Sequence, residues 1–249
     1  MIRTRSGRGN RRDFLRSGAA TLFALAASPL AARAQAPATA PLKIGMIGSG
    51  REGSALGTVW VKAGHPVMFS SRHPEQLKEL VAGLGPLAHA GTPAEAVAFA
   101  DVVAVVVPYS AMKQIGQDFG PALARKVLVL DVSNPSVPRD GELGTWAREK
   151  GAGLATQELL PGAHLVRAFN AINYLKVLET AKGEGGHFGV PMAGDDPQAI
   201  AVASMLAREA GYEPVLVGGL AMGKYLIPGP PLKADQTPDE IRKIFADLK

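Results

Sequence analysis

Residues 42–53 have the sequence Leu-Lys-Ile-Gly-Met-Ile-Gly-Ser-Gly-Arg-Glu-Gly, in which an apolar run leads directly into a glycine-rich turn. The apolar run predicts a buried strand, and the spacing after the turn predicts a helix over 55–63. Between them, Gly48, Gly50 and Gly53 fit the pattern Gly-x-Gly-x-x-Gly. These glycines would permit a tight turn, close approach of a pyrophosphate and close helix–sheet packing. The stretch therefore predicts a dinucleotide site at a helix N-terminus; the alternative is a glycine-rich loop without a ligand.

The end of the next predicted strand, residues 66–69, indicates which dinucleotide is bound. The sequence after it is Ser70-Ser71-Arg72-His73, which contains no acid. A site for NAD usually has Asp or Glu here to hold the ribose 2′-hydroxyl. Serine hydroxyls can instead donate to a 2′-phosphate, and the guanidinium of Arg72 can pair with it. We therefore expect NADP(H), bound by Ser70, Ser71 and Arg72. A solvated loop charge is the alternative for Arg72, and His73 fits either role.

The rest of the chain alternates predicted strands with predicted helices. Further strands are expected over 87–89, 101–107, 126–131, 163–169, 186–193 and 214–217, and further helices over 74–82, 93–100, 141–150, 154–160, 197–210 and from Pro238 onward. This order predicts an α/β fold, a Rossmann-type doubly wound and mostly parallel sheet in a single domain. The domain is expected over residues 37–227, followed by a Pro-rich loop and a short helix over 228–249. The loops after the strands, at 48–53, 70–73, 107–110, 133–135 and 169–173, are expected to meet at the carboxyl edge of the sheet.

The composition excludes several other classes of site. The 249 residues include no cysteine, which excludes disulfides, Cys-ligated metals and a thiol nucleophile. The five histidines are scattered and no Gly-x-Ser-x-Gly elbow is present, so we expect neither a serine hydrolase nor a metal site. The formal charge of +5 is concentrated in residues 1–36, which hold seven Arg and one Asp, so residues 37–249 carry only −1. This near-neutral remainder gives no support to nucleic-acid binding.

The basic segment has the order of parts expected of an export signal. Residues 10–16 are Asn-Arg-Arg-Asp-Phe-Leu-Arg, which resembles the twin-arginine pattern, and an apolar stretch over 18–32 follows. Small-x-small cleavage patterns come next, so the mature protein would begin near Gln35 or Pro37. We expect residues 1–36 to be a twin-arginine signal peptide recognised by the twin-arginine translocase, with a periplasmic product that keeps no stable membrane anchor after cleavage. A basic tail or an organelle-targeting segment is the alternative.

Five short segments form a more specific pattern than the glycine turn alone. They are residues 43–50 (Lys-Ile-Gly-Met-Ile-Gly-Ser-Gly), 70–72 (Ser-Ser-Arg), 131–135 (Asp-Val-Ser-Asn-Pro), 161–170 (Pro-Gly-Ala-His-Leu-Val-Arg-Ala-Phe-Asn) and 193–196 (Ala-Gly-Asp-Asp). In this order they resemble the NADPH-dependent reductases of the deazaflavin coenzyme F420. They resemble equally the cytosolic oxidoreductase domain of the six-transmembrane epithelial antigen metalloreductases. The resemblance implies hydride transfer between NADPH and a flavin or deazaflavin acceptor. Such transfer needs no enzymic general base, so no catalytic side chain is assigned.

The same resemblance implies roles for particular residues. Gly48, Ser49, Gly50, Arg51 and Glu52 would line the pyrophosphate, and Ser71 and Arg72 would hold the 2′-phosphate. Val107, Pro108 and Tyr109 would flank the adenosine and ribose, and Asn134, Ala168, Phe169 and Asn170 would surround the nicotinamide. Met222 and Tyr225 lie in a segment that approaches the acceptor in the family. Core packing is the alternative for Val107 and Phe169, and turn hydrogen bonds are the alternative for the two asparagines.

Two other functions stay open. A non-catalytic, exported NADP-binding module would keep the pyrophosphate turn but lack an acceptor pocket near Asn134 and Phe169. Pyrroline-5-carboxylate reductase has a similar N-terminal domain, but a helical dimerisation domain follows it where strands are expected here. The membrane haem domain of the metalloreductases has no counterpart in this sequence. The identity of the small-molecule acceptor, the direction of transfer and the formation of a homodimer also stay open.

Overall fold

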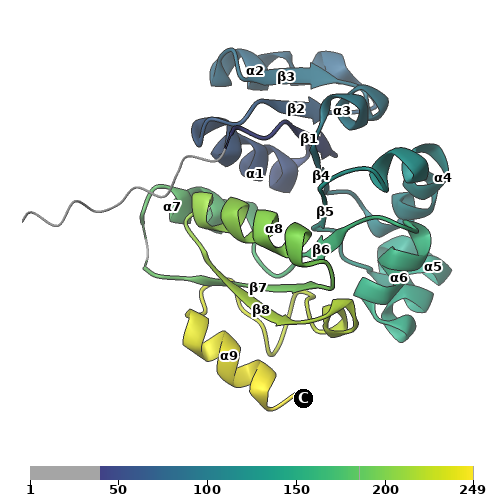
Figure 1. The fold of residues 1–249 in the computed structure, drawn as a ribbon, viewed down its shortest axis with the longest axis vertical. Helices are drawn as coiled ribbons and strands as arrows, with labels where there is room; N and C mark the ends of the chain where they lie inside the picture. The colour runs from purple at the N-terminus through teal and green to yellow at the C-terminus, as the bar shows by residue number, and fades with distance from the viewer. Residues whose placement is uncertain (1–39, 185, 249) are drawn as a thin grey trace, which may run out of the picture. The chain divides into compact units, whose positions relative to one another are not determined.

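A computed structural model describes residues 40–184 and 186–248, and the arginine-rich segment with its export pattern lies outside them. Eight strands within the described part form one sheet in the order β3-β2-β1-β4-β5-β6-β7-β8 (Figure 1). They are β1 (Ile44–Ile47), β2 (Val67–Ser70), β3 (Ala88–Gly91), β4 (Val102–Val105), β5 (Leu128–Asp131), β6 (Leu165–Arg167), β7 (Gly189–Gly194) and β8 (Glu213–Gly218). Neighbouring strands are parallel except for β6 and β7. The predicted Rossmann-type fold is confirmed.

Helices cover both faces of the sheet, as a doubly wound fold requires (Figure 1). One face carries α1 (Arg51–Lys62), α2 (Lys78–Leu84), α7 (Tyr174–Ala181) and α8 (Pro197–Glu209), with the short 3-10 turn η1 (Pro74–Leu77) before α2. The other carries α3 (Pro93–Phe99), α4 (Met112–Leu123), α5 (Val137–Lys150) and α6 (Ala152–Leu159). Two further 3-10 turns are η2 (Tyr109–Ala111) and η3 (Leu220–Lys224).

The central strand β4 shows how the sequence builds both layers. All four of its residues are fully buried. Because successive side chains in a strand point to opposite faces, Val102 and Ala104 join the core under α1 and α8, while Val103 and Val105 join the core under α3 and α4. A continuous β-branched run is therefore required, as the sequence predicts for a parallel strand buried on both faces.

Helices α4 and α7 are absent from the sequence prediction. The interior of α4 contains Gly116, Gly120 and Pro121, which are poor helix formers. Tertiary packing stabilises it, because Met112 and Leu123 bury their side chains completely. Helix α7 has only eight residues and follows a loop, but the side chain of its N-cap residue Asn173 accepts a hydrogen bond from the Lys176 N–H.

The C-terminal residues form part of the same compact unit as the sheet. Helix α9 (Pro238–Ala246) packs on β7 and β8 and buries Ile241 and Phe245 there. Its capping box at Thr237 and Glu240 confirms the helix start expected at Pro238. No helix in the described part of the chain has both the length and the apolar character needed to cross a bilayer.

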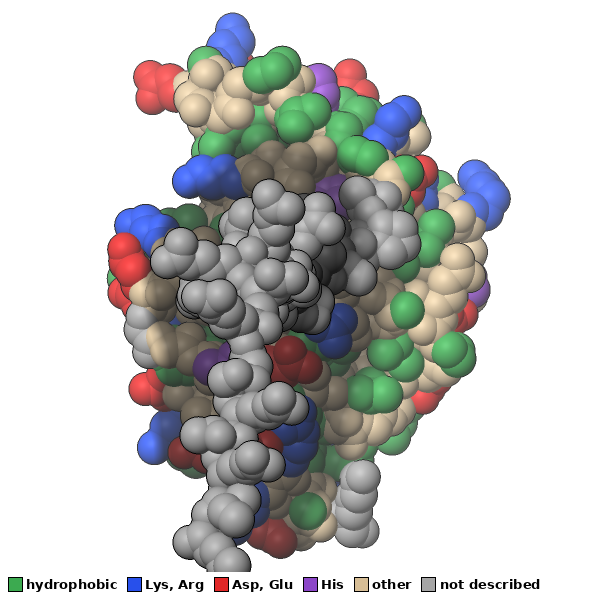
Figure 2. All heavy atoms as spheres, turned by 60° about the vertical axis from the view of Figure 1, so that its left-hand side comes forward, with side chains coloured by type: hydrophobic (Ala, Val, Ile, Leu, Met, Phe, Trp, Pro, Cys, Tyr) green, Lys and Arg blue, Asp and Glu red, His purple; other side chains and the backbone are tan. Residues whose placement is uncertain are grey.

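Charged side chains of both signs are mixed on the visible part of one face of the molecule. Figure 2 shows lysine and arginine interspersed with aspartate and glutamate among hydrophobic and neutral groups, without a field of one sign.

Candidate functional site

A cleft of about 590 Å³ opens at the carboxyl edge of the sheet, beyond the ends of the adjacent strands β1 and β4. The order of the strands reverses at this pair, and folds of this class bind ligands at such a reversal. The walls come from residues 50–53, 106–108, 132–134 and 169–173, together with Arg139 and Pro228. We call residues 48–53 the glycine rim, and residues 132–134 with 169–173 the asparagine rim.

The glycine rim has the backbone shape that the motif predicts. Gly48 has a φ of +96°, and a Cβ there would lie 2.4 Å from the Val106 carbonyl oxygen. A Cβ on Gly53 would lie 2.0 Å from the Gly48 carbonyl oxygen, so this turn packs tightly against the start of α1. At Gly50, in contrast, a Cβ would meet no described atom within 4 Å. Gly50 is the N-cap of α1 without a side-chain cap, so the open space beside it can admit an anion.

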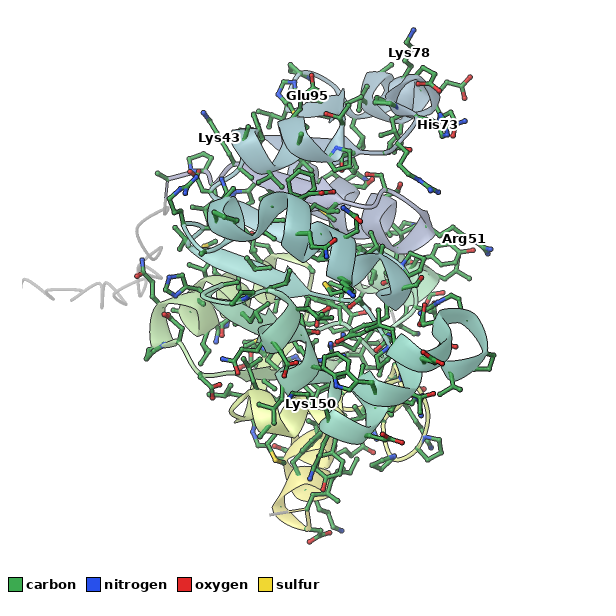
Figure 3. All side chains as sticks on the ribbon, turned by 90° about the vertical axis from the view of Figure 1, so that its right-hand side faces the viewer. Lys43, Arg51, His73, Lys78, Glu95 and Lys150 are labelled. Atoms are coloured by element: carbon green, nitrogen blue, oxygen red, sulfur yellow. The ribbon has the colours of Figure 1, made fainter. Side chains whose placement is uncertain are left out.

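The glycine rim also contains a hydroxyl group that is free to bind a ligand. The hydroxyl of Ser49 is buried and has no hydrogen-bond partner within the described residues. Figure 3 shows Arg51, at the start of α1, and His73, in the loop after β2, on the same side of the molecule, whereas Lys43, which precedes β1, lies on the opposite side. The loops after the two strands thus reach a common edge, as the sequence predicts.

The structure corrects one of the residues assigned to the 2′-phosphate. The Ser70 side chain is fully buried, and its hydroxyl donates to the Met46 carbonyl oxygen at 2.6 Å. It therefore holds β2 to β1 and is not available to a ligand. Ser71 is half-buried and Arg72 is exposed at the end of β2, so these two can still face a phosphate.

A second correction concerns Tyr109, which was expected to flank the adenosine and ribose. Val107 and Pro108 do line the cleft, but the chain turns after them into η2. The Tyr109 side chain is fully buried in the core under α4, and its hydroxyl shares a hydrogen bond with Thr156 Oγ1 at 3.1 Å. Its role is to pack the layer behind the cleft.

The asparagine rim presents two unused acceptor atoms. Asn134 and Asn170 both line the cleft, and the Asn134 Nδ2 donates to the Asn170 carbonyl oxygen at 2.7 Å. The Asn170 Nδ2 donates to the carbonyl oxygens of Asp131 and Ser133, each at 3.1 Å. The Oδ1 atoms of both asparagines are buried, and neither has a partner in the described part of the chain. Because an orphan buried acceptor is costly, this pair indicates a ligand that donates N–H or O–H bonds.

Ala168 and Phe169, the other residues assigned to the nicotinamide, are held in the core. Ala168 is buried and does not line the cleft. The Phe169 ring packs edge-on against the rings of Trp60 and Tyr212, with distances between ring centroids of 6.4 and 5.8 Å. Phe169 therefore contributes to the cleft as part of the turn that carries Asn170. Its φ of 63° is a left-handed conformation in a non-glycine residue, which is a form of local strain that occurs often at binding sites.

Glu52 lies where the two rims meet. Its side chain leaves the first turn of α1, lines the cleft and accepts the N–H of Tyr174 at the start of α7. Burial raises the pKa of Glu52 to about 7, although the Tyr174 N–H opposes this effect. Its Oε1 is buried without a hydrogen-bond partner among residues 40–184 and 186–248.

Some cleft residues are absent from the sequence prediction. Arg139 lines the cleft, donates to the Asn134 carbonyl oxygen at 2.6 Å and pairs with Asp140 at 2.9 Å. Pro228 lines it from the C-terminal side, whereas Met222 and Tyr225 pack against the core under α9. No local motif marks Arg139 or Pro228, because distant segments bring them to the cleft. No group of three His, Asp or Glu side chains suited to a metal ion gathers within the described ranges.

Comparisons with known proteins agree with the fold. A family model described as NADP oxidoreductase, coenzyme F420-dependent, matches residues 43–135. The metalloreductase STEAP3 of Rattus norvegicus is 33% identical over 195 residues, which are 77% of this chain and 36% of the relative. The chain thus spans little more than a third of that protein.

Two solved structures have a similar fold. A hypothetical protein from Sinorhizobium meliloti has a TM-score of 0.65 at 28% identity, over 78% of this chain and 93% of the neighbour. A protein from Arthrobacter sp. FB24, described as a candidate F420-dependent NADP reductase, has a TM-score of 0.63 at 19% identity, over 83% of this chain and 94% of the neighbour. The second likeness concerns the fold alone.

Proposed function

We propose that this protein transfers a hydride between NADP(H) and a flavin or deazaflavin acceptor, since residues 43–135 match the model of the coenzyme F420-dependent NADP oxidoreductases. The observation that carries the proposal is the pairing of the two rims across one cleft. On one side is an uncapped helix N-terminus with open space at Gly50, and on the other are the orphan oxygens of Asn134 and Asn170. These features are those that a pyrophosphate and a carboxamide require.

The residues that would hold the cofactor follow from this arrangement. Backbone N–H groups of the glycine rim and the Ser49 hydroxyl would receive the pyrophosphate. Ser71 and Arg72 would hold the 2′-phosphate, which makes NADP(H) the expected cofactor. The Oδ1 atoms of Asn134 and Asn170 would accept N–H bonds from the carboxamide. When bound, the cofactor supplies a hydride donor or acceptor carbon, and the acceptor completes its reduction with one proton from solvent.

The chain itself contributes position rather than acid–base chemistry. Hydride transfer depends on holding two rings in contact, and a cleft with fixed walls lowers the entropic cost of that arrangement. Arg139 and Pro228 line the cleft beside the asparagine rim, and this is the side on which we place the acceptor. The description of the matching family model as coenzyme F420-dependent supports an acceptor of the deazaflavin class, to which flavins are chemically related.

A turnover assay tests this function. The full chain is mixed with NADPH and, separately, FMN, FAD or F420, and loss of NADPH absorbance is followed. We expect oxidation that depends on the acceptor and that is much slower with NADH. Tight binding of NADPH without oxidation by any of these acceptors would favour a non-catalytic binding module.

A matched pair of variants tests whether the reaction occurs in the cleft. A Cβ at Gly50 or at the exposed Gly83 meets no described atom within 4 Å, so both Gly50→Val and Gly83→Val are expected to fold. Of these two glycines, Gly50 borders the cleft and Gly83 does not. Gly50→Val should therefore abolish NADPH oxidation while Gly83→Val retains it, and equal activities would place the cofactor elsewhere.

We also propose that the protein is delivered to the periplasm by the twin-arginine translocase. The support is the sequence of residues 10–16 and the apolar stretch after it. Replacing the motif arginines in the double variant Arg11→Lys, Arg12→Lys should retain the protein in the cytoplasm. The control Arg3→Lys, Arg5→Lys makes the same chemical change outside the motif and should leave export unaltered. Periplasmic recovery of both variants would contradict the proposed route.

A further inference from the structure

A buried ion pair lies directly behind the asparagine rim. Asp131 ends β5, Arg167 ends β6, and the two residues are paired in the sheet register. Both side chains are 0% exposed, and the Arg167 Nη1 donates to Asp131 Oδ2. Neither residue lines the cleft. Because removing two charges from water is expensive, burial of such a pair is by itself weak evidence of a contribution to stability.

Asp131 organises the loop that begins the asparagine rim. Its Oδ1 accepts the Ser133 N–H at 2.9 Å and also the Ser133 hydroxyl. Its Oδ2 accepts the Thr156 hydroxyl of α6 at 2.8 Å. The carboxylate therefore determines the path of the residues that lead to Asn134.

Arg167 connects three separate segments of the chain. Its Nη2 donates to the Ser133 carbonyl oxygen and to the Leu226 carbonyl oxygen, each at 3.1 Å. Leu226 comes two residues before Pro228 of the cleft wall. One guanidinium thus fixes the loop after β5 relative to the C-terminal wall, which the fork geometry of arginine allows and a single ammonium does not.

The bonds around this pair also fix the orientation of both asparagine amides. The Asn170 Nδ2 contacts the carbonyls of Asp131 and Ser133, and the Asn134 Nδ2 contacts the Asn170 carbonyl. A carbonyl oxygen can only accept, so the NH₂ group of each amide must face it. Each Oδ1 is consequently turned to where the structure offers it no partner in the described part of the chain.

We propose that Asp131 and Arg167 are positioning residues that hold the Asn134 and Asn170 oxygens ready for the carboxamide of the cofactor. This inference rests on the proposed binding of NADP(H). The ion pair does not touch the ligand and acts through Ser133, Asn134 and Asn170. Its loss should weaken contacts with the nicotinamide end and leave contacts with the adenosine end unchanged.

Comparison of two ligands separates these effects. NADP⁺ and 2′-phospho-ADP-ribose share the adenosine, 2′-phosphate and pyrophosphate, but only NADP⁺ carries the carboxamide. In wild type we expect NADP⁺ to bind more tightly. Arg167→Met should weaken NADP⁺ about tenfold, which corresponds to two hydrogen bonds, and should change the affinity for 2′-phospho-ADP-ribose less than about twofold.

Three further variants make the result decisive. Arg242→Met removes an arginine from an exposed ion pair on α9 and should alter neither affinity. Arg167→Lys keeps the charge but loses the fork, so it should recover only part of the NADP⁺ affinity. Thr156→Val removes one bond to Asp131 and should give a smaller loss of the same selectivity, which keeps the test valid if Arg167→Met does not fold.

Several outcomes would overturn the inference. One is an equal loss for both ligands in variants that remain folded, which would make the pair merely structural. Another is unchanged NADP⁺ affinity in both Arg167→Met and Thr156→Val. Wild-type protein that binds the two ligands equally would refute the carboxamide contact while leaving the pyrophosphate site intact. Wild-type protein that binds neither would refute the proposed cofactor itself.

Discussion

The glycine rim, residues 48–53, belongs to one continuous stretch that begins at residue 42, whereas the asparagine rim is assembled from segments far apart in the chain. The first rim consists of the turn after β1 and the start of α1, and its shape depends on backbone sterics at Gly48 and Gly53. The second depends on bonds between residues 34 to 59 positions apart, made by Arg167 and Asn170.

This difference determines which substitutions each rim tolerates. A rim formed by backbone geometry tolerates changes in most side chains but almost none at its glycines. A rim formed by a buried polar network fails as a unit, because removal of one member leaves others buried and unsatisfied. The two rims should therefore respond differently to substitution, and the following experiments compare them.

The largest effect is expected at the ion pair of the asparagine rim. Arg167→Met leaves the Asp131 carboxylate buried without its partner, and breaking such a pair typically costs about 3–5 kcal/mol. Arg242→Met breaks an exposed pair on α9 and should cost about 1 kcal/mol or less. Urea unfolding of both variants measures the difference, and equal losses would show that the buried pair has no special importance for the fold.

A smaller effect is expected after the neighbouring strand β2, where Arg72 is exposed and would add a 2′-phosphate contact to the pyrophosphate contacts of the glycine rim. Arg72→Ala removes a charge-assisted bond to the 2′-phosphate, worth about 1.5–3 kcal/mol, or roughly a 10- to 100-fold loss of NADPH affinity. NADH lacks this phosphate and should bind as before. Arg125→Ala, at an exposed arginine after α4, is the control. Calorimetric titrations that show the same loss for NADPH and NADH would refute the 2′-phosphate contact.

The packing of the glycine rim gives the third prediction. In Gly53→Ala the new Cβ would lie 2.0 Å from the Gly48 carbonyl oxygen, so the turn must shift. Overpacking of this kind costs about 1–3 kcal/mol. Gly50→Ala places the same methyl group in open space and should melt at nearly the wild-type temperature. A Gly53→Ala protein as stable as Gly50→Ala would mean that the turn is less constrained than the structure indicates.

The smallest effect is expected at Glu52, where the rims meet. Its pKa is raised by burial to about 7, so the folded protein binds the proton more tightly than the unfolded chain. The stabilising contribution is present below the ordinary value of 4.5 and is lost as the pH rises through about 7. Allowing for solvent screening of a partly exposed group, the loss amounts to about 1 kcal/mol.

Glu52→Gln removes this titration and tests its assignment. From the low to the high end of this pH range, the free energy of unfolding should fall more for the wild-type protein than for Glu52→Gln. Glu79→Gln, at an exposed position on α2, should keep the wild-type profile. Parallel profiles for wild type and Glu52→Gln would assign the titration to another group.

The sequence predicts the features that depend on local patterns and misses those that are assembled from distant segments, as the two rims illustrate. The strands, most helices and the glycine rim depend on local patterns, and the sequence predicts them within a few residues. It also places Asn134 and Asn170 at the site through the family resemblance. It assigns Ser70 and Tyr109 wrongly, because whether a hydroxyl is free depends on Met46 and Thr156, which lie on other elements.

The remaining residues of the site required the structure for a similar reason. Arg139 and Pro228 reach the cleft through packing of distant segments, and no spacing in the sequence relates them. In the sequence, Arg167 cannot be distinguished from an ordinary charged residue at the end of a strand. Only the register of β5 and β6 pairs it with Asp131. Helix α4 is similarly hidden, because its glycines argue against a helix while Gly116 permits close packing on Leu159.

The central claim, that the two rims hold NADPH for direct transfer to a ring acceptor, is tested most directly by the path of an isotope. NADPH is prepared with deuterium at either of the two C4 positions, and the full chain is given a deazaflavin, whose carbon acceptor retains the label. We expect one of the two labelled forms to transfer its deuterium to the reduced deazaflavin, as detected by mass spectrometry. Reduced deazaflavin without deuterium from either form would contradict it.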